Sequence, residues 1–567
     1  MKKKWHIKRP DGEKVSRLAS SLGLTNLVSS ILVSRGLDSA EEADAFLHPD
    51  LASLPDPFLM NGMEEAVSKI ASAIKNREKI GVFGDYDVDG VTGAALLTNF
   101  LRESGIEALT ILPKRNEGYG LLKSHIQKFK EAGTELLITV DNGIRAVEEA
   151  ELAERLGIDL IITDHHELGE SVPKTCATLN PHIDGSGSPF ANLCGCGVAF
   201  MLLLALRKRM RDHNLFPSEE PNLKKYLDLV AMGTVADVVP LTGTNRTLVK
   251  YGLQEITRAP RPGVAALLDI SATPRNDISP GSIGFRLAPR LNAAGRIGDA
   301  MKALEILTTE DEVEAASLAV ELDAANKARQ SMEKEILEEI ESAINADPEI
   351  ISGDVAVLHS DRWHVGVIGI IATRIAEKFG VPAFIISTSS EPARGSARSI
   401  EGINLVDLLS RCSDDLIGYG GHPMAAGITI KKEEIPKFKN KISEICSEAM
   451  LGRRQSEISI DAVADPSEIS TRLVEELDLL KPFGCGNPEP VLKLENASIV
   501  NRRIVGLNHL KMLLKTPAGN FDSIGFELGE RLPQEAKNIS LAFVPRLNDW
   551  NGSVNLQLKI RDLIVEE

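Results

Sequence analysis

With 567 residues, the chain is too long for a single hydrophobic core, and domain sizes predict about three or four units. Hydrophobic residues make up 43% and charged residues 26% of the sequence, as in ordinary globular proteins. The net charge of −17 argues against a broadly basic, histone-like surface, although a local cationic groove on an acidic protein can still attract nucleic acid.

The basic start is not followed by the apolar stretch of a signal peptide, and no apolar run approaches the length of a membrane span. The six cysteines are scattered and give no disulfide framework. We therefore expect a cytoplasmic protein without membrane contact.

The first part of the chain, residues 1–75, alternates short helical patterns with proline and glycine breaks. It predicts a small N-terminal helical segment. From residue 79 to residue 240, short apolar runs alternate with helical patterns. The runs typical of buried strands are KIGVFG, EALTILP, ELLITVDNG and DLIITDHH. This alternation predicts an α/β domain over residues 76–299, with a parallel sheet and helices on both faces.

Residues 300–350 predict a long connecting helix, because apolar side chains recur at helical spacing through residue 340. It either bridges two lobes or covers one of them. A second, smaller α/β pattern follows over residues 351–450. Residues 450–457, MLGRRQSE, are typical of a linker.

The tail, residues 456–567, is rich in strand-like runs, and Asn551-Gly552 is a hairpin-turn signal. A small β-barrel is predicted here. The oligonucleotide-binding (OB) barrel is one candidate, because strands alone do not identify the barrel type.

Acidic side chains follow the strand-like runs of the 76–299 domain. They are Asp85, Asp87 and Asp89, then Asp141, then Asp164 with His165 and His166, and finally Asp237. Three carboxylates on alternate residues repel one another unless a cation or a proton lies between them. We interpret all four positions as strand ends, where open α/β sheets place their sites, although Asp237 also fits a helix cap.

Each of these motifs alone is typical of a turn or a cap. Together they predict one site, because the ends of neighbouring parallel strands lie close together. Carboxylates with a neutral imidazole suit Mn²⁺ or Mg²⁺ better than structural zinc. Two such ions side by side activate water and stabilise charge on a phosphoryl group.

These residues also resemble a known family. DYDVDG (85–90), VDNG (140–143), DHH (164–166) and GTVADVVP (233–240) resemble motifs one to four of the DHH phosphoesterase superfamily. The resemblance is narrowed by RLNAAGRI (290–297), GSARS (395–399) and GGHPMAAG (420–427). These motifs are similar to those of the RecJ family of single-stranded-DNA-specific 5′→3′ exonucleases, and the match runs from about residue 5 to the end.

The resemblance implies a DHH lobe, a long helix, a DHHA1 lobe and an OB-like barrel. It also implies two ions, one held by Asp87 and Asp141 and the other by Asp89, Asp141, His165 and Asp237. Asp141 would bridge them, and Asp85 would lie beside the first ion, directly or through water. Among the catalytic residues, His166 would contact the scissile phosphate, and Asp164 would orient a histidine.

A substrate pocket is implied as well. Arg115, Ser396 and Arg398 would bind the 5′ phosphate, Arg296 a phosphate near the metals, and His422 the substrate backbone. Arginine suits this role because its planar fork matches phosphate oxygens. For Cys194 and Cys196 we expect buried packing, and for Trp363 either base stacking or packing.

The expected function is therefore a metal-dependent exonuclease that degrades single-stranded DNA 5′→3′ to 5′-mononucleotides, in DNA repair and recombination. A helicase and a single-strand-binding protein are possible partners. Two alternatives stay open: a DHH-type phosphatase or oligoribonuclease acting on short nucleotides, and an inactive scaffold that binds nucleic acid.

Overall fold

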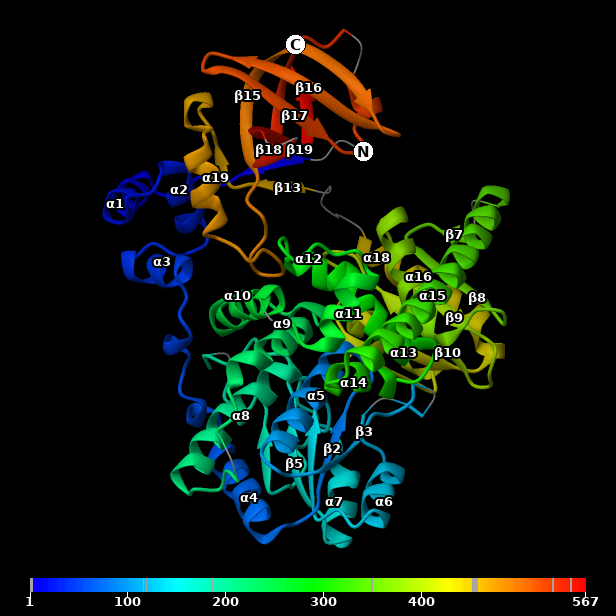
Figure 1. Cartoon of the computed structure of the whole chain (residues 1–567). Coiled ribbons are helices and arrows are strands. Elements are labelled where there is room, and N and C mark those ends of the chain that lie inside the picture. Colours follow the sequence, from blue (N-terminus) through cyan, green and yellow to red (C-terminus); the bar gives the residue numbers. More distant parts are fainter. Residues whose placement is uncertain are drawn as a thin grey trace.

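The chain folds into two α/β lobes, a long helix that joins them, and a β-barrel domain (Figure 1). The computed structural model describes residues 4–566, apart from 116, 119, 186, 218, 259, 348–349, 451–456, 533–534 and 551–552. The predicted linker around residues 451–456 and the predicted turn Asn551-Gly552 lie outside the described residues. Within the described part, no helix combines the length and the apolar character that a membrane crossing requires.

The first lobe is built on a five-stranded parallel sheet of order β3-β2-β4-β5-β6. Its strands are β2 Ile80–Gly84, β3 Ala108–Ile111, β4 Leu136–Val140, β5 Asp159–Thr163 and β6 Ala177–Leu179. The four strands predicted from the apolar runs are confirmed, and β6 is an additional strand. The strands are apolar almost throughout because helices cover both faces.

The two faces of this sheet have separate cores. The larger one is covered by α4 Met63–Asn76, α5 Val88–Glu103, α8 Gly195–Asp212 and α9 Leu227–Ala236. The other is covered by α6 Lys123–Glu131 and α7 Val147–Arg155. The remaining helices of the lobe are α10 Gly243–Arg258, α11 Pro262–Ile270, α12 Pro280–Ser282, α13 Ala288–Ile297 and α14 Met301–Thr308. A π-helical turn, Ile283–Leu287, precedes α13.

The long connecting helix is α15, Glu312–Ala346. The prediction of one continuous helix from residue 300 is wrong, because α14 ends at Thr308 and a new helix begins after Asp311. The Asp311 carboxylate accepts hydrogen bonds from the N–H groups of Val313 and Glu314, at 2.7 and 3.0 Å, and so caps the new helix. Leu318 and Leu322 pack in the first lobe's core, whereas Ile336 and Ile340 pack in the second's. The helix therefore bridges the lobes.

The second lobe has a mixed six-stranded sheet of order β11-β12-β10-β9-β8-β7. Its strands are β7 Ile351–Ser352, β8 Val355–Ser360, β9 Ala383–Ser387, β10 Ala393–Arg398, β11 Gly418–His422 and β12 Ala425–Ile430. Its helices are α16 Val365–Phe379, α17 Leu405–Ser410 and α18 Ile435–Met450. Trp363 is only 4% exposed in this lobe's core, so base stacking by this residue is excluded and packing is confirmed.

The barrel closes through five strands of order β15-β16-β17-β19-β18, with β18 pairing back to β15. They are β15 Leu492–Val505, β16 His509–Thr516, β17 Gly519–Gly525, β18 Asn538–Trp550 and β19 Ser553–Val565. Before the barrel come β13 Glu457–Ile460, β14 Ala462–Val463 and α19 Thr471–Asp478. Closure removes the exposed sheet edges that would otherwise pair with other chains.

The N-terminal segment is divided between two cores. Its elements are β1 Lys4–Ile7, α1 Gly12–Leu22, α2 Asn26–Ser34 and α3 Ala40–Leu47, followed by α4. β1 pairs in parallel with β13, and α1 to α3 pack in the same core as the barrel, whereas α4 packs in the first lobe. The first and last parts of the chain therefore lie side by side (Figure 1).

Candidate active site

Three aspartates follow β2, and they lie in a turn that leads into α5. Asp85 comes directly after the strand, Asp87 is the N-cap of α5, and Asp89 lies in the first helical turn. The Asp87 carboxylate accepts hydrogen bonds from the N–H groups of Asp89 and Gly90, at 3.0 and 3.2 Å. A Cβ atom at Gly90 would lie 2.4 Å from the backbone nitrogen of Asp85, so only glycine allows this turn. The turn directs the acids toward one point.

Asp141 follows β4, and its backbone is in the left-handed region, with φ at 62°. A non-glycine residue in this region costs about 1–3 kcal/mol, and such strain is found at functional sites. The start of α8 holds the Asp141 backbone in this conformation, since a Cβ atom on Gly195 would lie 2.5 Å from the Asp141 Cβ. Asp141 is 2% exposed. The close packing fixes its carboxylate at the centre of the site.

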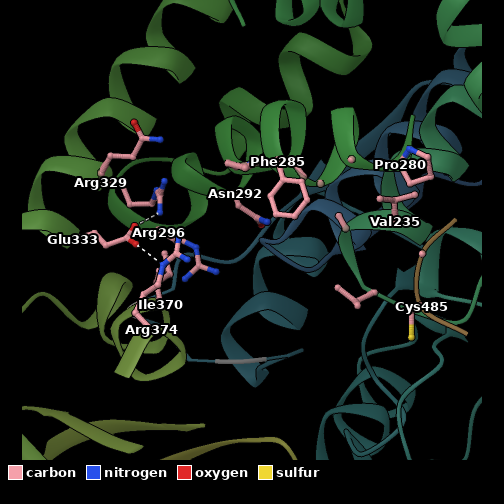
Figure 2. A pocket seen from close by; sticks show the side chains of 18 of the residues that line it. Val235, Pro280, Phe285, Asn292, Arg296, Arg329, Glu333, Ile370, Arg374 and Cys485 are labelled. Carbon is pink, nitrogen blue, oxygen red and sulfur yellow. Dashed lines mark hydrogen bonds and ion pairs between the residues drawn. The ribbon is translucent and has the colours of Figure 1, made fainter. Parts of the chain in front are cut away.

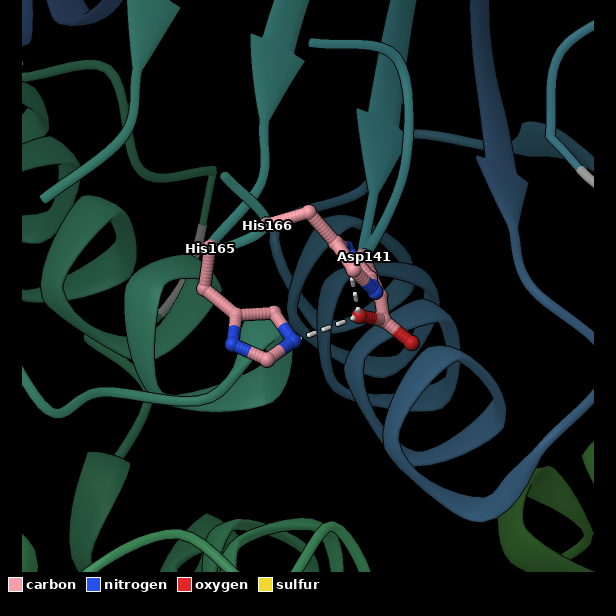
Figure 3. A group of neighbouring side chains, drawn as sticks. All are labelled: Asp141, His165 and His166. Atoms are coloured by element: carbon pink, nitrogen blue, oxygen red, sulfur yellow. Dashed lines mark ion pairs between the residues drawn. The ribbon is translucent and has the colours of Figure 1, made fainter. Parts of the chain in front are cut away.

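Two histidines follow β5, and both face Asp141 (Figure 3). His165 Nε2 lies 3.1 Å from Asp141 Oδ1. Asp164 holds the second histidine in place, because His166 Nδ1 donates a hydrogen bond to Asp164 Oδ1 at 2.7 Å. Asp164 Oδ2 accepts from the N–H group of Ile144 at 2.9 Å. Asp164 therefore orients His166, as the sequence resemblance implies for a histidine of the site.

Asp237 reaches the site from a helix. It is the C-cap of α9, so its interpretation as a strand end is wrong and the helix-cap alternative is correct. Its Oδ2 atom lies 3.5 Å from His165 Nε2. α9 comes this close because of Gly233, where a Cβ atom would lie 2.7 Å from Asp89 Oδ1.

The structure brings all the predicted metal ligands together. Two groups of side chains have ligand atoms within 4.8 Å of one another: Asp85, Asp87 and Asp141, and Asp89, His165 and Asp237. Asp141 also groups with His165 and His166. It therefore lies between the two groups, where a bridging ligand is needed. Oxygen atoms with one or two imidazoles suit Mn²⁺ and Mg²⁺, so the donor set fits the predicted ions.

Asp89 is held by the first turn of α8. The N–H groups of Gly195 and Cys196 donate to its two carboxylate oxygens, at 2.6 and 3.0 Å. Cys194 and Cys196 are fully buried, as expected, and Cys194 is also the N-cap of α8. The interpretation as packing residues missed the backbone contribution. The glycines of LCGCGVAF are its sequence signal, because they allow a close backbone approach.

Burial and mutual repulsion raise the pKa values of the acids. Burial and the charge of Asp87 raise the pKa of Asp85 well above its usual range, and burial and the charge of Asp89 do so for Asp141. Burial and the charge of Asp87 raise the pKa of Asp89 to about 6. Burial and the charge of Asp89 raise the pKa of Asp237 to about 8. Bound cations would remove this cost of ionisation, and Asp85 Oδ1 is buried without a hydrogen-bond partner among the described residues.

The two histidines have opposite charge states. Burial and the neighbouring His166 lower the pKa of His165 to about 3, so His165 is neutral, as a metal ligand must be. Burial alone would lower the pKa of His166, but the hydrogen bond and charge of Asp164 outweigh it and raise that pKa to about 9. His166 is therefore a cation at neutral pH. It can donate a hydrogen bond to an anionic oxygen.

The raised pKa values predict how the stability of the metal-free protein depends on pH. An aspartate whose pKa is raised by folding binds more protons folded than unfolded, so stability falls by about 1.4 kcal/mol per pH unit and proton between the two pKa values. For Asp237 this range extends from 3.8 to about 8. With a chelator present, we expect Tm to fall as the pH rises from about 5 to about 8. Mn²⁺ should raise Tm more at the upper end.

Thermal unfolding followed by circular dichroism measures this effect. The matched control is Asp237→Asn, which removes one titrating group and should show a shallower decline of Tm with pH. A Tm that rises over this range in chelator would contradict the prediction.

Next to the acids lies a group of arginines, which we call the arginine pocket: Arg115, Arg296, Arg329 and Arg398. Burial and the charges of the other three lower the pKa of Arg296 to about 10. Arg398 Nη1 donates to Ser396 Oγ at 3.4 Å, and the Arg115 guanidinium stacks on the Tyr86 ring at 4.6 Å. Several cations this close repel unless an anion lies between them. The pocket is suited to phosphate.

Sequence reasoning missed Tyr86 and Arg329 in this pocket. Tyr86 lies inside DYDVDG, where only the aspartates were interpreted as functional residues. Arg329 lies on α15, where it is surrounded by charges typical of an exposed helix. It is 9% exposed, and its guanidinium donates to Glu333 at 2.8 Å and to Asn326 at 3.1 Å. Only the packing of α15 against the lobes distinguishes it from surface residues.

His422 brings the second lobe to the site. It ends β11, and its ring stacks near that of His166, with the ring centroids 6.2 Å apart. A Cβ atom at Gly421 would lie 2.3 Å from the carbonyl oxygen of Ala425, so glycine is required beside it. Residues of both lobes therefore lie at the site.

A cavity of about 1140 Å³ lies beside the site, because Ala236 and Val238, the neighbours of Asp237, line it together with Arg296. It is lined by the end of α9, the π-helical turn, α13, α15, α16 and a segment of the barrel domain around Cys485 (Figure 2). Arg296, Arg329, Glu333 and Arg374 lie at one end, and Val235 and Cys485 at the other. Phe285, 85% exposed, lies between them. All three large units of the protein therefore contribute to one cavity.

Three family models match the chain: the DHH family N-terminal domain over residues 79–234, the DHHA1 domain over residues 352–448, and the RecJ OB domain over residues 460–562. A Bacillus subtilis protein named single-stranded-DNA-specific exonuclease RecJ is 39% identical over 576 residues, which cover 100% of this chain and 71% of that protein.

Two crystal structures of RecJ from Thermus thermophilus are also similar. The complex with Mn²⁺ matches with a TM-score of 0.84 at 31% identity, covering 100% of this chain and 80% of that one. The complex with Mg²⁺ matches with a TM-score of 0.79 at 30% identity, covering 100% and 79%. Sequence and fold agree over the whole length of this chain, and the chain belongs to the RecJ family of the DHH superfamily.

Proposed function

We propose that the chain is a metal-dependent exonuclease that degrades single-stranded DNA 5′→3′ to 5′-mononucleotides, in DNA repair and recombination. The observation that carries the proposal is the pair of ligand groups around Asp141, next to the arginine pocket. Paired ions favour phosphodiester hydrolysis because charge builds up on the phosphoryl oxygens in the transition state, and the arginines add binding groups for the substrate's phosphates.

The residues of the site take separate roles in this proposal. Asp85, Asp87 and Asp141 would hold one ion, and Asp89, Asp141, His165 and Asp237 would hold the other. Mn²⁺ or Mg²⁺ would supply a Lewis acid and an activated water there. The protonated His166 donates a hydrogen bond to the scissile phosphate, and Asp164 keeps its ring oriented. His422 contacts the substrate backbone from the second lobe.

The arginine pocket sets the polarity. Arg115, Ser396 and Arg398 bind the 5′ phosphate, while Arg296 binds a phosphate nearer the metals. Tyr86 supports this arrangement, because its ring holds the Arg115 guanidinium in place. A strand anchored at its 5′ end presents its first phosphodiester to the metals, so cleavage releases 5′-mononucleotides.

The cavity is the path of the remaining strand. It extends from Val235, two residues before Asp237, to the barrel domain. Phe285 offers an exposed ring on which a base can stack, and stacking is tolerant of sequence. The path also speaks against the rival enzyme, a phosphatase or oligoribonuclease on short nucleotides, because a short substrate needs neither the cavity nor the barrel. The intact ligand groups speak against an inactive scaffold.

Single-stranded DNA is the partner that this function requires. A helicase that frees the strand and a single-strand-binding protein that covers it are further partners that we propose from the family resemblance. We also propose a cytoplasmic location, which the six free cysteines support, because thiols stay reduced there.

Digestion of one long single strand, labelled separately at each end, tests the proposed function. With Mn²⁺, the 5′ label should appear at once as a mononucleotide, while the 3′ label should remain in long fragments that shorten over time. A dinucleotide substrate separates the rival enzyme. Faster cleavage of the dinucleotide than of the long strand, or early release of the 3′ label, would overturn the proposal.

The 5′-phosphate pocket gives a separate prediction. Arg398→Ala should lower kcat/KM on a 5′-phosphorylated strand by roughly tenfold to a hundredfold, the usual effect of losing a charge-assisted hydrogen bond. On a strand with a 5′ hydroxyl the decrease in kcat/KM should be small, since that substrate has no 5′ phosphate for Arg398 to bind. The control is Arg394→Ala, an exposed residue on the same strand β10. If Arg398→Ala lowers kcat/KM equally on the 5′-phosphorylated and the 5′-hydroxyl DNA, Arg398 does not bind the 5′ phosphate.

A further inference from the structure

A buried arginine joins three parts of the chain that are far apart in sequence. Arg246, on α10, is 1% exposed. Its Nε donates to the carbonyl oxygen of Phe46 at 2.8 Å, its Nη1 to that of Leu480 at 2.7 Å, and its Nη2 to that of Leu479 at 2.9 Å. The guanidinium also stacks on the Phe46 ring at 3.9 Å. Arg246 thus links the first lobe to α3 and to the segment after α19.

Among the described residues, the charges that act on Arg246 include no carboxylate, so its positive charge is not balanced by an ion pair. Burial, and then the charge of Arg35, lower its pKa to about 10. A buried cation without a counterion is costly, and a buried apolar side chain is usually at least as stabilising. Stability alone is therefore a poor explanation for Arg246. Its hydrogen bonds to three carbonyl groups point instead to a role in positioning the segments that carry those groups.

The segment that Arg246 holds continues into residues 481–490, KPFGCGNPEP, which we call the docking loop. Asn487, 1% exposed, fixes its shape by donating to the carbonyl oxygens of Leu480 and Pro482, at 2.9 and 2.8 Å. Arg35 donates to the Asn487 side chain and, at 2.7 Å, to the carbonyl oxygen of Pro488. The loop is thus tied to Arg35 and to its own backbone.

The docking loop also lies against the segment that follows Asp237. The N–H group of Leu241 donates to the carbonyl oxygen of Cys485 at 2.8 Å. Two glycines allow this contact: a Cβ atom would lie 2.7 Å from Leu241 Cδ1 at Gly484 and 2.9 Å from Pro240 Cβ at Gly486. The docking loop therefore lies against Pro240 and Leu241, which follow the proposed metal ligand Asp237 by three and four residues. Its residues 483–485 also line the cavity.

We propose that Arg246 and the docking loop are positioning elements that hold the barrel domain in register with the metal site. This inference rests on the proposed function. A long strand that occupies the barrel domain and the metal site together depends on the distance between them. A short oligonucleotide fills only the arginine pocket and the metal site, so it does not depend on that distance. A length-dependent defect is the signature of such a role, whereas a merely structural role affects both substrates alike.

Gly486→Ala tests the contact without disturbing a core. The added methyl group would meet Pro240, and φ at Gly486 is 67°. The matched control is Gly23→Ala, because Gly23 has a φ of 68° but no atom within 4 Å of the added methyl group. The control therefore carries the same backbone strain without the contact.

We expect Gly486→Ala to lower kcat/KM on a long 5′-phosphorylated strand by about tenfold, equivalent to about 1.4 kcal/mol. Its kcat/KM on a 5′-phosphorylated trinucleotide and its Mn²⁺ affinity should match those of the wild type. Gly23→Ala should match the wild type on both substrates. Arg246→Lys, which keeps the charge but loses the fork, should reproduce the length-dependent defect.

Two results would overturn the inference. If Gly486→Ala loses activity equally on both substrates, or on neither, while the wild type degrades the long strand, the positioning role fails and the proposed function survives. If the wild type cleaves the trinucleotide but not the long strand, the proposed function fails and this inference fails with it. Thermal unfolding of each variant identifies a folding defect, and an equal activity loss that follows Tm counts against the positioning role.

Discussion

Asp141→Asn is expected to abolish Mn²⁺ binding at both ligand groups and to reduce nuclease activity by roughly a thousandfold or more, since metal ions contribute several kcal/mol of transition-state stabilisation. Asp141 lies between the two groups, so each of them loses a charged ligand. Asparagine is the right replacement, because Asp141 has a φ of 62° and asparagine tolerates the left-handed region better than alanine.

This substitution also separates loss of function from loss of folding. Burial and neighbouring charges raise the pKa of Asp141, so its ionised form destabilises the metal-free protein at neutral pH. In chelator, Asp141→Asn should therefore unfold at the same temperature as the wild type or above it. Isothermal titration with Mn²⁺ and thermal unfolding measure the two effects. Asp562→Asn, which removes an equally buried carboxylate from the barrel domain, is the control for Mn²⁺ binding.

If Asp141→Asn binds Mn²⁺ with wild-type stoichiometry, the shared position of this residue between two ions is wrong.

His166→Gln is expected to lower kcat by about a hundredfold to a thousandfold, the effect of losing one preorganised donor to a developing oxyanion. Glutamine keeps a polar side chain but cannot carry the positive charge that Asp164 maintains on His166. Mn²⁺ affinity should stay unchanged, because the proposed contact is with the phosphate. If Mn²⁺ affinity falls instead, His166 is a metal ligand in the group with Asp141 and His165.

Asp164→Asn provides the companion measurement. It removes the hydrogen bond and the charge that raise the pKa of His166 to about 9. The pH at which activity declines on the alkaline side should therefore move lower, and kcat at neutral pH should fall by about tenfold to a hundredfold. In His166→Gln that alkaline decline should disappear. An unchanged pH profile in Asp164→Asn would show that the protonated imidazole is not needed.

Much of the first lobe was predictable, because parallel strands buried on both faces are continuous apolar runs and their ends carry the polar residues. Asp85, Asp141 and His165 were found in this way. Asp237 was found as well, but for a wrong reason: it ends α9, a helix that is mostly apolar and buried and therefore has no clear amphipathic period. A fully buried helix cannot be told from a buried strand by periodicity alone.

Other parts of the site depend on contacts that are distant in sequence. The N–H groups that hold Asp89 belong to α8, more than a hundred residues later. Backbone donors have no residue signature, so only the fold reveals them. Arg329 and Tyr86 were missed for a related reason, because their partners lie on other elements. The break before α15 was overlooked although Asp311 is a good capping residue.

The pairing of β1 with β13, and the packing of α1 to α3 against the barrel, have a consequence for synthesis of the protein. The ribosome releases these helices long before their partners exist, so the apolar side chains of Leu27, Ile31 and Leu32 stay uncovered until residues 457–565 emerge. A recombinant barrel domain expressed without residues 4–47 would expose the apolar side chains that otherwise pack against α1 to α3. Supplying that segment as a separate peptide should restore its solubility.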